Sequence, residues 1–166
     1  MTSQSLFYSP KLQLDLSDNN VSGEIPSEIG LLSSNLFQIN LGANAFTGTI
    51  PPELGDLSLL LMLDLHGNAL SGELPDLEYL TNLAFLHIQH NTGITGSIPG
   101  SWSQLTALEE LRLAGTSLWG DFDGIVCFLD QLSYSSASCG DGFIECQCCT
   151  ECCNVINFEG DTDTCG

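Results

Sequence analysis

The chain has 166 residues, 43% of them hydrophobic, and a formal net charge of −19 from 21 carboxylates against two cationic side chains, Lys11 and Arg112. Two cations cannot neutralise a phosphate backbone, so nucleic-acid binding is excluded and docking on an anionic membrane is disfavoured. No apolar run approaches the ~18 residues of a transmembrane helix. Residues 1–11 contain neither the basic nor the apolar segment of a signal peptide.

A motif of the form LxLxxN recurs along the first three quarters of the chain, with successive copies 25, 24, 23 and 25 residues apart. The copies begin at Leu14, Ile39, Leu63, Leu86 and Leu111. The asparagine position holds Asn19, Asn44, Asn68 and Asn91, and then Thr116. A glycine follows each copy, and four copies continue with an aliphatic residue and a proline.

Each LxL segment predicts a short strand whose two outer residues point to one side and whose middle residue points to the other. One unit cannot bury its apolar side alone, but stacked units bury a continuous core. An asparagine facing inward at the following turn can satisfy unpaired backbone groups, which predicts an asparagine ladder through the stack. Thr116 has fewer hydrogen-bonding atoms and suits the last turn.

This pattern is that of a leucine-rich repeat. The segments VSGEIPSEIG, FTGTIPPELG and LSGELPDL resemble the plant-type subclass of that family. The resemblance implies an α/β fold: a right-handed leucine-rich repeat solenoid, or horseshoe, with parallel strands on its concave face and a disulfide-rich C-terminal cap. We expect a partial repeat or truncated edge over 1–11, five repeats over 12–120 and the cap over 121–166.

Two repeats depart from the pattern. The fourth contains one extra residue between Asn91 and Gly96, which predicts a local bulge. The third is short after Pro75. Both changes fall on turns or on the convex side, so we expect the strands to stay aligned.

All the cysteines lie in the last quarter of the chain: Cys127, Cys139, Cys146, Cys148, Cys149, Cys152, Cys153 and Cys165. An even number in a short segment indicates disulfide bonds, whose pairing the sequence leaves open. The run CQCCTECC resembles the caps of some algal leucine-rich repeat proteins, and a metal–thiolate cluster is the alternative. Disulfides imply an extracellular or cell-surface location, so a chain without a signal peptide is expected to be truncated.

The middle residues of the repeats should form a column on the concave face, and a second column should lie beside it. The scarce cationic and titratable side chains gather there, which predicts a ligand-binding site at Asp64, His66, Phe85, His87, Gln89, His90 and Arg112. A simple solvated polar face and a divalent-metal site are the alternatives. The favoured interpretation requires no metal and no cofactor.

Three further positions carry predictions. Asn20 begins an N-glycosylation triplet, Asn-Val-Ser. Trp102 occupies a repeat position held elsewhere by Ile or Leu, so we expect it in the core. Trp119 replaces the small residue before a repeat glycine, and we expect it to pack under the cap.

The resemblance implies an extracellular recognition module, part of a receptor-like or secreted protein, that binds peptide, protein or glycan on its concave face. The alternatives are an inhibitor of secreted cell-wall hydrolases, similar to polygalacturonase inhibitors, and a structural or ice-binding surface protein. No catalytic motif or nucleophile accompanies the histidines, so an enzyme is not expected. The oligomeric state is open.

Overall fold

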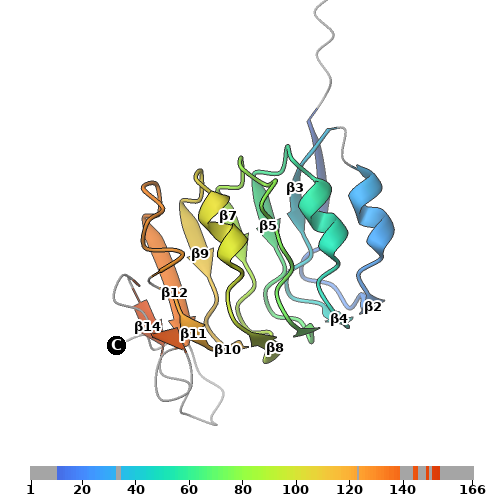
Figure 1. Ribbon diagram of the computed structural model, residues 1–166. Coiled ribbons are helices and arrows are strands. Elements are labelled where there is room, and N and C mark those ends of the chain that lie inside the picture. The colour runs from blue at the N-terminus through green and yellow to red at the C-terminus, as the bar shows by residue number, and fades with distance from the viewer. Residues whose placement is uncertain are drawn as a thin grey trace, which may run out of the picture.

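The repeats build a stack of parallel strands in a computed structural model of the chain (Figure 1). The structure describes residues 11–32, 35–122, 124–138, 144–145, 149 and 151–153. One sheet runs the length of the stack in the order β1-β3-β5-β7-β9-β12-β14. Its strands are Leu12–Asp15 (β1), Leu36–Asn40 (β3), Met62–Asp64 (β5), Phe85–His87 (β7), Glu110–Arg112 (β9), Tyr134–Ser138 (β12) and Glu151–Cys153 (β14).

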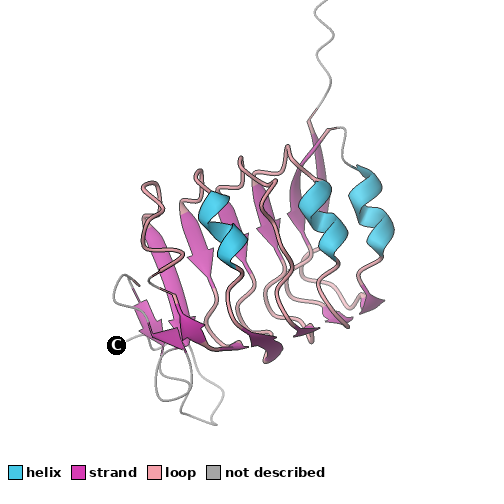
Figure 2. Ribbon diagram, viewed as in Figure 1, coloured by secondary structure: helices cyan, strands magenta, loops and turns pink. Residues whose placement is uncertain are grey.

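The opposite side of the stack consists of short strands, turns and short helices (Figure 2). The short strands are Ser22–Glu24 (β2), Ala45–Thr47 (β4), Ser71–Gly72 (β6), Gly93–Gly96 (β8), Ser117–Leu118 (β10), Gly120–Asp121 (β11) and Ile144–Glu145 (β13). Three 3-10 helices follow the aliphatic-proline pairs: Ser27–Leu32 (η1), Pro52–Asp56 (η2) and Gly100–Gln104 (η3). The shortened third repeat has turns in place of a helix, because too few residues remain between Pro75 and β7.

The predicted alignment of the strands is confirmed across both irregular repeats. Asp64 in β5 pairs with His87 in β7, and His87 pairs with Arg112 in β9. The extra residue of the fourth repeat is taken up in a turn, where the amide of Ile94 donates to the carbonyl of Asn91 at 3.0 Å. The strand side of the stack therefore keeps its columns while the turns absorb the changes in length.

The inward leucines and isoleucines of successive strands form one core that runs through the stack, and Trp102 is buried within it as predicted. The asparagine ladder is also confirmed. Asn68 Nδ2 donates to the carbonyls of Leu65 (3.1 Å) and Leu41 (3.0 Å), and its Oδ1 accepts from the amide of Phe46 (3.0 Å). The asparagines of the second and fourth copies make equivalent contacts. Thr116 donates one hydrogen bond within its own turn.

The strand side does not end with the fifth repeat. β12 pairs with β9 and β14 pairs with β12, so part of the cysteine-rich segment adds two strands to the same sheet. The prediction that Trp119 packs under the cap is wrong, since 55% of Trp119 is exposed. Successive residues of a strand alternate sides, and Leu118 takes the inward position next to it. In the described part of the chain, no helix is long and apolar enough to cross a membrane.

Candidate functional site

The middle column of the sheet brings a carboxylate, an imidazole and a guanidinium into line. Asp64, His87 and Arg112 occupy the same register position in β5, β7 and β9. Neighbouring parallel strands are about 4.8 Å apart, so each of these side chains lies within reach of the next. The sequence predicted this column, and the structure confirms its order.

Asp64 connects two of the histidines. His66 Nδ1 lies 2.7 Å from Asp64 Oδ1, and the His66 backbone amide donates to the same oxygen at 3.0 Å. His87 Nδ1 lies 3.5 Å from the other oxygen, Oδ2. The side chain of Asp64 therefore bridges the two imidazoles.

The environment of Asp64 favours its charged form. Burial alone raises the pKa of this carboxyl, because a low dielectric penalises charge. The contact with His87, the two hydrogen bonds from His66 and the charge of His66 outweigh burial, so the pKa of Asp64 lies below its ordinary value of 3.8. Asp64 is therefore an anion at neutral pH and holds the imidazoles on either side of it.

A second carboxylate continues the network toward the C-terminal end. His87 Nε2 lies 3.0 Å from Glu110 Oε1 without the geometry of a hydrogen bond, and Arg112 Nε donates to the same oxygen. The Arg112 guanidinium carbon also stands 5.1 Å from the centroid of the Tyr134 ring, an arrangement that permits a cation–π contact. Acidic and basic side chains thus alternate along a line formed by Asp64, His87, Glu110 and Arg112. The line ends beside Tyr134 of β12.

Glu110 and Tyr134 were not predicted from the sequence. Glu110 occupies the register position of Phe85 in the neighbouring strand, so the column of Phe85 should have pointed to it. Tyr134 lies beyond the last repeat, where no repeat spacing could place it. Its position opposite Glu110 becomes visible only when β12 joins the sheet.

The remaining predicted residues surround this network in different ways. The ring of Phe85 stands edge-on to that of His87, with centroids 6.5 Å apart. Gln89 has a half-buried side chain, and its buried carboxamide oxygen accepts no hydrogen bond. His90 lies after the end of β7 with φ of 59°, and its ring faces Gly115. His90 therefore belongs to the turn, beside the edge of the column rather than within it.

The side chains of the network differ in exposure: some are buried and can orient their neighbours, whereas others are partly exposed and can contact a ligand. The side chains of Asp64 and His87 are about nine-tenths buried, whereas 34% of the His66 side chain and 42% of that of Arg112 are exposed. The carboxylates can therefore orient His66 and Arg112, whose exposed faces can meet a ligand. Among the residues that the structure describes, no three His, Cys, Asp or Glu side chains are arranged to hold a metal ion.

The other predicted sites lie elsewhere. Asn20 is exposed in the turn before β2, so its side chain is accessible for the attachment of a glycan. Cys127 and Cys149 are each disulfide-bonded. The side chains of the other six cysteines fall outside the described part of the chain, namely Cys139, Cys146, Cys148, Cys152, Cys153 and Cys165.

Comparison with known proteins agrees with this architecture. The family model "Leucine Rich Repeat" matches residues 12–32. No curated protein matches the chain. A chain of the BIR3–SERK2 complex from Arabidopsis thaliana is 31% identical with a TM-score of 0.65, and the match covers 81% of this chain and 72% of that one.

Two further solved structures are similar. The ectodomain of the receptor kinase SOBIR1 from Arabidopsis thaliana is 27% identical, with a TM-score of 0.70 and coverage of 80% of this chain and 71% of that chain. The plant peptide hormone receptor RGFR1, in complex with RGF2, is 33% identical with a TM-score of 0.70. That match covers 75% of this chain but only 20% of RGFR1.

The parallel-strand solenoid, the asparagine ladder and these likenesses define the class: a plant-type leucine-rich repeat module. The chain belongs to the leucine-rich repeat family and is similar to the ectodomains of plant receptor kinases. It spans about a fifth of the length of the longer receptors that it matches.

Proposed function

We propose that this protein is an extracellular recognition module that binds a peptide, protein or glycan on the concave face. The observation that carries the proposal is the network around Asp64 and Glu110, which holds two partly exposed polar groups, His66 and Arg112, in fixed positions. Recognition surfaces are enriched in aromatic and arginine side chains, and here the guanidinium carbon of Arg112 lies 5.1 Å from the centroid of the Tyr134 ring.

The similar proteins support this proposal at a coarser level. RGFR1 is in complex with RGF2, and HAESA is in complex with the peptide hormone IDA and the co-receptor SERK1. Those proteins are receptors, and this chain matches part of each. Binding rather than catalysis is therefore the function that we assign to the concave face.

An extracellular or cell-surface location is part of the proposal. The bonded state of Cys127 and Cys149 favours an oxidising compartment, because intracellular thiols are kept reduced. The net charge of −19 keeps such a module soluble and directs its recognition away from nucleic acid. The exposed Asn20 is available for glycosylation in the same compartment.

The proposal is tested by screening the immobilised full chain against arrays of secreted peptides, secreted proteins including polygalacturonases, and cell-wall glycans. The test variant is the double substitution His66→Ala with Arg112→Ala. The matched control is Gln104→Glu on the convex helix η3, where the side chain is exposed. Ligands bound by the wild type and the control, but weakened at least about tenfold in the double variant, would support the proposal. Equal binding by all three proteins would contradict it.

A further inference from the structure

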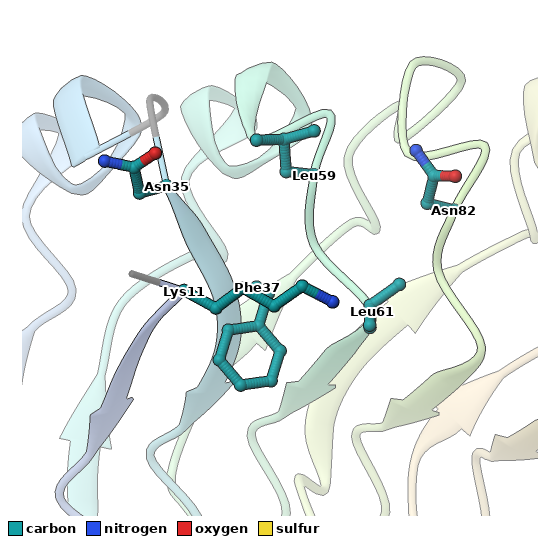
Figure 3. A pocket seen from close by; sticks show the side chains of 6 residues that line it. All are labelled: Lys11, Asn35, Phe37, Leu59, Leu61 and Asn82. Atoms are coloured by element: carbon teal, nitrogen blue, oxygen red, sulfur yellow. The ribbon is translucent and has the colours of Figure 1, made fainter. Parts of the chain in front are cut away.

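A pocket of about 370 Å³ opens at the beginning of the first strands, separate from the Asp64–Arg112 network (Figure 3). Its lining is formed by Lys11, Asn35, Phe37, Leu59, Leu61 and Asn82. These residues precede or begin β1, β3, β5 and β7, so the pocket lies along one rim of the sheet. Its volume falls within the range of small-molecule sites, roughly 300–1,000 Å³.

A register shift between β1 and β3 occurs at Phe37, which lines this pocket. Leu12 pairs with Leu36 and Gln13 with Gln38, so Phe37 has no opposite residue in β1. An extra residue of this kind redirects its side chain, and bulges of this kind often lie next to functional sites. Without this extra residue, the inward-facing Leu36 would be followed directly by the outward-facing Gln38, with no phenylalanine between them.

The pocket is confined to the first repeats because its register position changes character along the sheet. The amide of Leu61 donates to the carbonyl of Phe37, that of Ala84 to Leu61, and that of Glu109 to Ala84. This position is therefore occupied by Phe, Leu, Ala and Glu in successive repeats. The large apolar side chains of Phe37 and Leu61 line the pocket, which does not extend to the small Ala84 or the acidic Glu109.

Lys11 supplies the charge of the pocket. Its Nζ stands 5.5 Å from the centroid of the Phe37 ring, and Figure 3 shows the side chain extended across that ring in the direction of Leu61. None of the described residues that line the pocket is acidic, although the whole chain carries 21 carboxylates. Lys11 is therefore the charged group among the described lining residues, and it favours a ligand of negative charge.

The polar atoms at the rim complete the site. The Asn82 side chain is held there because its Nδ2 donates to the carbonyl of Ser58 at 2.9 Å. Asn35 lies on the other side of the pocket, after η1. Leu59 stands between them and is 48% exposed, which leaves apolar surface available to a ligand.

We propose that this pocket binds the carboxylate of a ligand with an apolar body, in which Lys11 pairs with the carboxylate while Phe37, Leu59 and Leu61 contact the body. The ammonium group and the aromatic face lie side by side, so one small molecule can engage both at once. The proposal does not depend on recognition at the Asp64–Arg112 network, and its failure would leave that function untouched.

The experiment follows the methyl NMR signals of Leu59 and Leu61 in the full chain at 0.15 M salt. Hydrocinnamate is the probe, and hydrocinnamyl alcohol is its uncharged counterpart. In the wild type, the acid should bind about two- to fivefold more tightly than the alcohol, as expected for one partly exposed ion pair. Equal affinities, or no shift of either leucine, would overturn the proposal without any variant being made.

Three variants sharpen the test. Lys11→Met should remove the preference for the acid, whereas Lys11→Arg should retain it. Phe37→Ala should weaken acid and alcohol alike, because both lose the aromatic contact. Gln104→Glu changes the net charge by the same amount as Lys11→Met but at η3, and it should leave the preference intact. A preference that survives Lys11→Met, or disappears in Gln104→Glu, would contradict the assignment.

A second pair of probes distinguishes the source of the carboxylate. N-acetyl-phenylalanine carries the carboxylate of a peptide C-terminus, and N-acetyl-phenylalaninamide lacks it. Preferential binding of the acetylated acid would assign the pocket to peptide termini. Preferential binding of hydrocinnamate alone would assign it to free small acids.

Discussion

Replacing Asn91 by alanine should be among the most damaging single changes in the chain. The side chain is fully buried, donating to the carbonyls of Leu65 and Ile88 at 3.0 Å and accepting from the amide of Leu70 at 3.1 Å. Alanine would leave the Ile88 carbonyl and the Leu70 amide without these partners in the core, whereas the Leu65 carbonyl would keep the hydrogen bond from Asn68 Nδ2. A net hydrogen bond contributes about 1 kcal/mol, and an unsatisfied buried group costs about 1–3 kcal/mol. We therefore expect a loss of about 3–5 kcal/mol in the free energy of unfolding.

The matched control is Asn19→Ala, at the same repeat position but exposed. Its side chain donates to the carbonyls of Leu16 and Ser17, which water can satisfy instead. This change should cost less than about 1 kcal/mol. Urea unfolding monitored by the fluorescence of buried Trp102 measures both values. Equal losses in the two variants, or a loss below about 1 kcal/mol for Asn91→Ala, would refute the argument that buried backbone satisfaction stabilises the stack.

Three further predictions concern the network and the cap. The pKa of Asp64 is depressed in the folded state, so its contribution to stability is complete above its ordinary value of 3.8 and is lost as the pH falls through the folded value. The difference in urea midpoint between the wild type and Asp64→Asn should therefore narrow from pH 7 to pH 3, and a constant difference would contradict the assignment. A Cβ at Gly42 would lie 2.2 Å from His66 Nδ1, so Gly42→Ala should displace that ring from Asp64, as a changed NMR signal of His66 would show. Gly100→Ala, which meets no atom within 4 Å, is the control and should leave the signal unchanged. Four disulfides from the eight cysteines predict an intact mass eight hydrogens below the reduced value and no reaction with alkylating reagent, whereas reactive thiols would argue against the extracellular assignment.

Repeat spacing predicted the parts of the site that lie on repeat positions. Because a period near 24 residues returns the chain to the same point of the stack, Asp64, His87 and Arg112 could be aligned from the printed sequence alone. The same reasoning placed Trp102 in the core. It failed for Trp119, because a position defined by a neighbouring glycine does not say which side of the short strand the residue faces.

The sequence by itself determined the architecture of this protein, since the regular leucines can be buried only by stacking and the asparagines can be satisfied only inside the turns. The tertiary structure decided how the side chains meet. Only there does Asp64 bridge His66 and His87, and only there does β12 bring Tyr134 under Arg112. The physical reason is that periodicity defines columns, whereas bulges, added strands and side-chain contacts depend on the packing of segments without a repeat.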